Sequence, residues 1–129
     1  MPSIWELQEQ GTVSSPGLKK ILSSDMPGQV ASLAEDSFVV LMTMGHTTDK
    51  PILLEILKQG RKFPYLGVIG SKAKAARLKQ DVVDAGLPAE LQTAFYCPIG
   101  LDIGSNHPQE IAVSVAAQLI QERDRLRRL

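Results

Sequence analysis

The 129-residue sequence contains a single cysteine, Cys97, and no apolar run long enough to cross a membrane. One cysteine excludes an internal disulfide, which is typical of proteins from a reducing compartment. A membrane span takes roughly 18 apolar residues, and the N-terminus lacks the basic stretch and apolar core of a secretory signal. We therefore expect a cytoplasmic protein that is not attached to a membrane.

Net charge is absent as well. Fourteen Lys and Arg residues balance fourteen Asp and Glu residues, so no overall field attracts nucleic acid or an anionic membrane. The GxGxxG, P-loop and GxSxG motifs are missing, as is any basic recognition helix. The composition, 43% apolar and 22% charged, is that of an ordinary folded domain. Any anion site must therefore be local.

The first 28 residues show little periodicity. Residues 4–10 have weak helical character, residues 11–17 are typical of a turn, and residues 18–22 favour another helical turn. We expect residues 1–28 to be irregular or to hold short helices. The main domain would then cover residues 29–129 and open with a short helix over residues 29–35.

From Phe38 onward, apolar runs typical of buried strands alternate with helical patterns. The runs cover residues 38–42, 65–69 and 95–97, and the helical patterns cover residues 49–59, 72–85 and 108–121, the last with Ile111, Val115 and Leu119 facing inward. This alternation predicts an α/β fold with a parallel sheet between helices, a three-layer Rossmann-like arrangement. Ligands bind such sheets at the carboxyl ends of the strands.

Three segments are predicted to meet at that edge. Gly70-Ser71-Lys72, followed by Lys74, joins a strand to a helix, where small residues and free N–H groups suit a phosphate or another anion. The alternative is a tight turn in which Ser71 caps the helix and the lysines are solvated.

Gly45-His46 is the second segment, and His46 is placed to contact a ligand. With Asp49 alone it is too sparse for a metal site. The alternative is a hydrogen-bonded loop histidine with Asp49 or Thr48 as a helix cap.

The third segment is the loop that begins at Pro98 and includes Gly100 and Asp102. Asp102 is open to three roles: contacting a ligand, capping a helix or orienting His46. We expect Cys97, just before the loop, to be a buried, unreactive thiol.

These segments resemble motifs of the XdhC/CoxI family. Residues 67–74 resemble its G-x-I-G-S-[RK]-x-K motif, and residues 98–114 (PIGLDIGSNHPQEIAVS) resemble its P-[IV]-G-L-D-I-G-x-x-[TS]-P-x-E-I-A-[VL]-S motif. Thr43, His46 and Asp49 match its T-x-x-H-x-x-D motif. The resemblance covers about residues 38–121 and is to the C-terminal part of the family's Rossmann-like domain.

The resemblance implies a maturation factor rather than an enzyme. Proteins of this family bind the molybdenum cofactor, a pterin with a phosphate, and deliver it to the apoenzyme of a molybdenum hydroxylase such as xanthine dehydrogenase. It implies cofactor-binding roles for Gly45, His46, Gly70, Ser71, Lys72, Lys74, Gly100 and Asp102.

The chain lacks the glycine-rich G-A-G-H-V segment that opens the family's Rossmann domain, and so holds about half of it. A half-sheet has open strand edges. We therefore expect a homodimer, or association with a separate N-terminal XdhC-type partner. Two rival interpretations are an NAD(P)-binding oxidoreductase fragment, which the missing GxGxxG disfavours, and a protein-interaction scaffold without a ligand.

Overall fold

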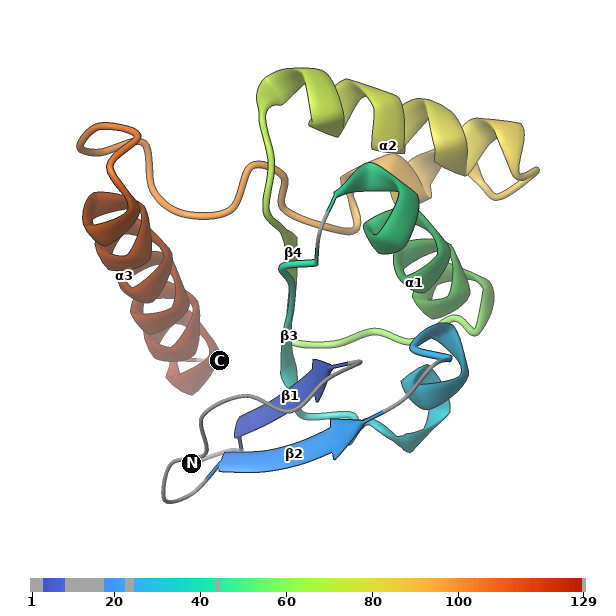
Figure 1. The fold of residues 1–129 in the computed structure, drawn as a ribbon, viewed down its shortest axis with the longest axis horizontal. Helices are drawn as coiled ribbons and strands as arrows, with labels where there is room; N and C mark the ends of the chain where they lie inside the picture. The colour runs from blue at the N-terminus through green and yellow to red at the C-terminus, as the bar shows by residue number, and fades with distance from the viewer. Residues whose placement is uncertain (1–3, 9–17, 23–24, 44, 129) are drawn as a thin grey trace.

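The computed structural model of the protein describes residues 4–8, 18–22, 25–43 and 45–128 (Figure 1). In chain order the elements are β1 (Ile4–Gln8), β2 (Leu18–Leu22), the 3-10 helix η1 (Pro27–Ser32), β3 (Phe38–Leu41), α1 (His46–Lys58), β4 (Tyr65–Val68), α2 (Lys72–Asp84), the 3-10 helix η2 (Ala89–Thr93) and α3 (Pro108–Arg127). None of these helices is long and apolar enough to span a bilayer.

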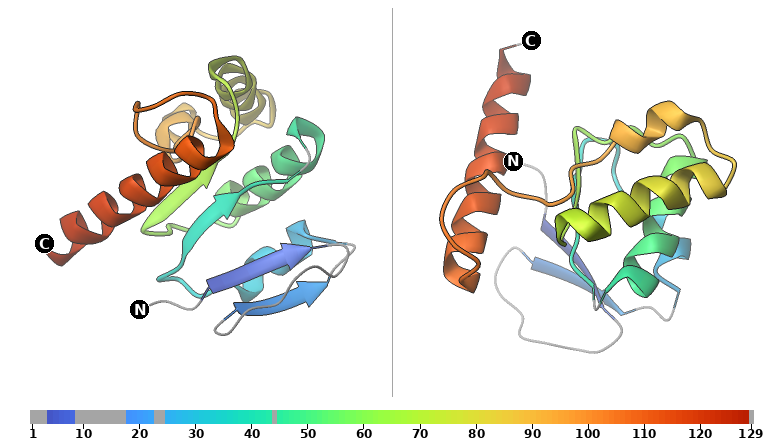
Figure 2. Two further views of the ribbon diagram at one scale, coloured as in Figure 1. Left: turned by 60° about the vertical axis from the view of Figure 1, so that its left-hand side comes forward. Right: turned by 90° about the horizontal axis from the view of Figure 1, so that it is seen from above.

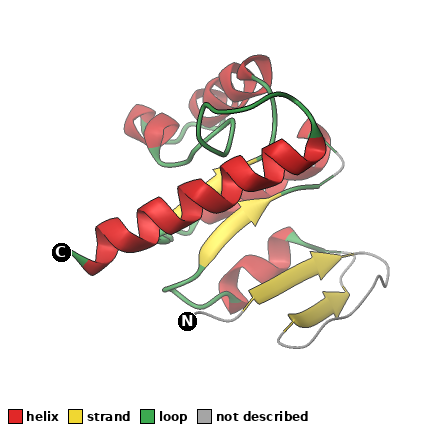
Figure 3. Cartoon of the chain, turned by 90° about the vertical axis from the view of Figure 1, so that its left-hand side faces the viewer, coloured by secondary structure: helices red, strands yellow, loops and turns green. Residues whose placement is uncertain are grey.

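The strands form two parallel pairs, β1 with β2 and β3 with β4. The β1–β2 pair lies beside β3, on the side away from β4 (Figures 2 and 3). Residues beyond β4 add one parallel bridge, between Gly67 and Tyr96. The predicted parallel, Rossmann-like α/β fold is confirmed. The expected third strand over residues 95–97 is reduced to that bridge.

The helical character expected near the N-terminus is wrong, because residues 4–8 and 18–22 are strands. Weak local propensity did not decide these segments; each makes a complete ladder with the other, from the Ile4–Leu18 pair to the Gln8–Leu22 pair. The turn expected over residues 11–17 lies outside the described residues. The proposed boundary at residue 28 stays a prediction.

The β3–β4 sheet separates two layers of helix, as the end-on view in Figure 1 shows. Helices α1 and α2 cover one face, and α3 lies on the other. Side chains alternate along a strand, so Val39 and Leu41 of β3 join the core beneath α1 while Phe38 and Val40 face the other way and are half-buried. That core also contains Leu53, Ile56, Leu57, Leu66, Val68, Leu78 and Val82.

Helix α3 is held differently from the prediction. Its buried side chains are the polar residues Ser114 and Gln118. The residues expected to face inward (Ile111, Val115 and Leu119) are only half-buried. The helix starts where expected, at Pro108, and the His107 side chain caps it by accepting a hydrogen bond from the Gln109 N–H at 3.2 Å.

Candidate binding edge

Two strand-to-helix connections meet at the carboxyl edge of the β3–β4 sheet. The two strands run parallel and in register, with Leu41 beside Val68. The Ile69 N–H extends the pairing by donating to the Leu41 carbonyl at 3.0 Å. The Gly45-His46 and Gly70-Ser71 segments, which follow these strands, therefore leave the sheet at the same edge.

The first of these connections differs in detail from the prediction. Helix α1 begins at His46, three residues earlier than expected, and its N-cap is Gly45, which has no side chain to bond to the helix. The Asp49 N–H donates to the Gly45 carbonyl at 2.9 Å, so Asp49 lies inside the first turn and is not the cap. This leaves its carboxylate free to bond elsewhere.

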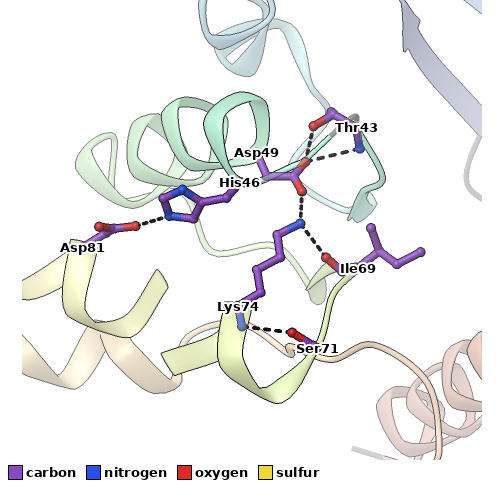
Figure 4. A network of polar contacts seen from close by, with 7 residues as sticks. All are labelled: Thr43, His46, Asp49, Ile69, Ser71, Lys74 and Asp81. Carbon is purple, nitrogen blue, oxygen red and sulfur yellow. Dashed lines mark hydrogen bonds and ion pairs between the residues drawn. The ribbon is translucent and has the colours of Figure 1, made fainter. Parts of the chain in front are cut away.

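Asp49 is the centre of a buried polar network (Figure 4). Its side chain is fully buried and accepts hydrogen bonds from the backbone N–H and the hydroxyl of Thr43, at 3.2 and 2.5 Å. The Lys74 ammonium forms an ion pair with the same carboxylate and donates to the Ile69 carbonyl at 2.7 Å. A buried carboxylate needs such partners to offset its lost hydration.

His46 points away from this network, toward α2 (Figure 4). Its Nε2 lies 2.6 Å from Asp81 Oδ2, and the Lys50 ammonium approaches the other Asp81 oxygen at 3.6 Å. The sequence left open whether Asp102 orients His46. In the structure the carboxylate paired with His46 is that of Asp81, so that role falls to a residue of α2.

The second connection carries the features predicted for an anion site. The Ser71 hydroxyl caps α2 by accepting a hydrogen bond from the Lys74 N–H at 3.2 Å, which is the structural role that the sequence offered as the alternative to a ligand contact. Lys72 is exposed and makes no ion pair with the described part of the chain. The first N–H groups of a helix have no partner within it, so the start of α2 combines free donors with a solvated cation.

The glycine loop packs against α3. Gly100 has φ of 95°, and a Cβ there would lie 2.5 Å from the Ser114 hydroxyl. Its N–H donates to the Gln118 side-chain oxygen at 2.8 Å, and its carbonyl accepts from the Gln118 amide at 3.2 Å. Asp102 is exposed and has no hydrogen-bond partner among the described residues. The contact that fixes this loop is therefore with α3.

Tyr65 completes the attachment of α3. Its hydroxyl donates to the same Gln118 oxygen at 2.5 Å, and its ring stacks on Tyr96 with 5.1 Å between centroids. Burial, followed by the nearby Tyr96 and Glu122, raises the pKa of Tyr65 to about 12. Burial also raises the pKa of the half-buried Cys97 thiol, so its environment does not favour a reactive thiolate.

Sequence reasoning missed several contacts at this edge and at α3: those that Asp49 makes with Thr43 and Lys74, and those that Asp81 and Gln118 make. Thr43 and Asp49 were both in a recognised motif, but six residues apart they gave no sign of touching. Asp81 and Gln118 lie on helices at polar positions that sequence patterns assign to solvent. Two shallow clefts lie at the opposite end of the sheet, around Arg61, Lys62 and Phe63, away from every predicted site residue.

Comparison with known proteins places this geometry in a family. Residues 7–119 match the XdhC Rossmann domain. The chain belongs to the XdhC family. The match begins near the end of β1 and ends within α3, so it covers β2, the β3–β4 pair and the candidate binding edge.

Two curated relatives and one solved structure are similar to this XdhC-family chain. It is 34% identical over 87 residues to a probable xanthine dehydrogenase subunit from Bacillus subtilis strain 168, covering 67% of this chain and 24% of that one. It is 28% identical over 93 residues to the uncharacterized protein YqeB of Escherichia coli K12, covering 72% of this chain and 16% of that one.

The solved structure is a xanthine dehydrogenase from Bacillus halodurans at 2.80 Å resolution. It superposes with a TM-score of 0.64 at 31% identity, covering 84% of this chain and 30% of that one. The chain thus spans about a quarter or less of the length of the curated relatives it matches.

Proposed function

We propose that this chain is an XdhC-type accessory module that binds, or helps to bind, the molybdenum cofactor during maturation of a molybdenum hydroxylase such as xanthine dehydrogenase. Its membership of the XdhC family supports an accessory role. Two of the similar proteins carry xanthine dehydrogenase in their names, which supports a molybdenum hydroxylase as the client.

The observation that carries the proposal is the convergence of two helix N-termini at one sheet edge. Helices α1 and α2 begin directly after neighbouring parallel strands, and helix N-termini favour anions. The Ser71 hydroxyl and the exposed Lys72 ammonium, which pairs with no carboxylate in the described part of the chain, lie at the start of α2. These groups fit the phosphate of a pterin cofactor.

The residues that we expect to contact the phosphate are those whose backbone or side chain is open at this edge. Within the described part of the chain, a Cβ at Gly45 would meet nothing within 4 Å, so we take the backbone there as open to a ligand. We place the phosphate against Gly45, Gly70, Ser71 and Lys72. The other residues that the sequence named, His46, Lys74, Gly100 and Asp102, would line or support this edge; Lys74 and His46 already have carboxylate partners.

The chain's partners follow from its size and its open sheet. The β3–β4 sheet has two hydrogen-bonded strands. Sheets with so few strands gain stability when a further strand pairs with an open edge. We propose a cytoplasmic homodimer, or a complex with a separate N-terminal XdhC-type chain, that meets the hydroxylase apoenzyme. Sedimentation at micromolar concentration checks this: a stable monomer that does not respond to such a partner would contradict it.

Titration with isolated molybdenum cofactor and, separately, with NADH tests the binding function. We expect cofactor binding that Lys72→Gln weakens about two- to fivefold, the loss for one solvated charge contact. Lys62→Gln is the matched control, because Lys62 is exposed at the other end of the sheet. Binding of NADH alone would favour an oxidoreductase fragment, and binding of neither would leave a protein-interaction scaffold.

A further inference from the structure

Two sequence motifs far apart in the chain meet in one buried contact. Thr43 and Asp49 come from the β3–α1 connection, and Lys74 comes from the first turn of α2. The Asp49 carboxylate, which has no exposed surface, receives both Thr43 donors and the Lys74 ammonium. The Lys74 side chain is 14% exposed. One carboxylate thus joins the ends of both strands.

The Lys74 stem also occupies the space beneath the turn. A Cβ placed on Gly70 would collide with the Cδ of Lys74, so the absence of a side chain at Gly70 allows the stem to pass. The ammonium then reaches back to the Ile69 carbonyl at 2.7 Å. The Lys74 side chain therefore packs against the Gly70-Ser71 turn while its ammonium pairs with Asp49. One motif supplies Lys74 and the other supplies Asp49.

Lys72 and Lys74 are two residues apart but differ in exposure and in the charge that surrounds them. Lys74 is largely buried, and Asp49 neutralises its charge locally. Lys72 is exposed and has no ion-pair partner among the described residues. Of these two lysines, an anion at the start of α2 would therefore meet an uncompensated charge on Lys72, since breaking the buried pair would leave Asp49 without its cation.

We infer that Asp49 and Lys74 are positioning residues, whose buried ion pair fixes the Gly70-Ser71 turn at the binding edge, and that Lys72 is the lysine that contacts the bound anion. The role of Lys72 rests on the proposed function. The existence of the ion pair is tested first, without any ligand.

Lysine reactivity in the free protein tests the ion pair. Each amine is modified with a limiting amount of an acylating reagent, and its rate is read by mass spectrometry. We expect Lys72 to react at the rate of Lys62, and Lys74 to react about tenfold more slowly, because its amine must leave the carboxylate first. A Lys74 rate equal to that of Lys62 would overturn the positioning role.

Matched variants then show which contact protects Lys74. Asp49→Asn should bring the Lys74 rate toward that of Lys62. Asp84→Asn removes an exposed carboxylate from α2, the helix that carries Lys74, and should leave the Lys74 rate unchanged. Because a buried substitution can prevent folding, Thr43→Val and Thr43→Ser form a milder pair. The valine removes a hydroxyl that bonds to Asp49, and the serine keeps it. A faster Lys74 reaction in the valine variant alone supports the network; equal rates overturn it.

Cofactor added to the same assay separates positioning from contact. Molybdenum cofactor released from a denatured hydroxylase should protect Lys72 and leave Lys74 and Lys62 unchanged. Folded Thr43→Val protein should bind it about threefold more weakly, which is at the low end of what one hydrogen bond contributes. Unchanged affinity would make the pair purely structural and overturn its positioning role. If neither lysine is protected while Lys74 stays slow, the Lys72 role and the proposed function fail, but the ion pair stands.

Discussion

The two faces of the β3–β4 sheet are built on different principles. On the α1–α2 face the core contacts are apolar, with Leu53, Ile56, Leu78 and Val82 fully buried, and the polar Asp49 network lies at the edge of this core. On the α3 face the helix is attached through Gln118, which bonds to Tyr65 and to both backbone groups of Gly100. Apolar burial supplies stability without direction, whereas hydrogen bonds fix one geometry.

This difference matters for the binding edge, because each face positions a different part of it. The apolar face sets α1 and α2, whose N-termini make the proposed anion site. The polar face sets the glycine loop that leads from the sheet to α3. We therefore expect mutations on the first face to unfold the domain, and mutations on the second to release α3 and the loop while the rest stays folded.

The largest effect should come from Leu53→Ala in α1. Leu53 is fully buried in the apolar core, and truncation of a buried leucine costs about 2–5 kcal/mol through lost burial and the cavity that remains. Urea unfolding followed by circular dichroism measures this loss. A loss of less than about 1 kcal/mol, as for a surface site, would show that this face is not the stabilising one.

Gln118→Ala should have the next largest effect, about 1–3 kcal/mol, because it leaves Tyr65 and Gly100 polar groups without partners. The effect should also be local. Hydrogen exchange should accelerate in α3 and in residues 98–107, while α1 and α2 keep their protection. Uniform acceleration across all helices would mean that the two faces form one cooperative unit.

High pH should weaken the α3 face selectively. Tyr65 has a pKa raised to about 12 by burial, against 10.0 for an ordinary tyrosine. A raised folded-state pKa means that the contribution to stability is complete below pH 10 and is lost as the pH rises through 12. Ultraviolet titration of the two tyrosinates should show Tyr65 ionising well above 10, and Tyr65→Phe should remove that transition. Ionisation of Tyr65 near pH 10 would contradict its buried hydrogen bond.

The smallest effect should come from the outer surface of α3. Val113 is 61% exposed, and surface substitutions usually change stability by less than about 0.5 kcal/mol. Val113→Ser should therefore leave the urea midpoint of the monomer unchanged. A clear stabilisation or loss would show that this surface is covered by another molecule, such as the second copy in the proposed dimer.

The apolar face was largely predictable from the sequence, and the polar face was not. Continuous apolar runs gave β3 and β4, and the helical patterns over residues 49–59 and 72–85 gave α1 and α2. The α3 face depends on Gln118, a polar residue whose burial no periodicity reveals, because its partners Tyr65 and Gly100 lie 53 and 18 residues away. The same reason hides the Asp81 partner of His46, 35 residues away.

The candidate site divides in the same way. The Ser71 cap is a local contact within four residues, and the sequence offered it as one of two roles for this turn. The Lys74–Asp49 pair spans 25 residues, and the sequence instead assigned Lys74 to the ligand and Asp49 to a helix cap. Strand pairing, rather than any local preference, brings these two side chains together. Long-range polar contacts are therefore the part of this site that only the structure supplies.

The most direct test of the proposed function is amide shift mapping on the isotopically labelled chain during titration with molybdenum cofactor. The account predicts the largest shifts at Gly45, Gly70, Ser71 and Lys72, and none around Gly60 and Lys62 at the opposite end of the sheet. No shifts at saturating cofactor, or shifts centred on the clefts around Lys62 and Phe63, would contradict it.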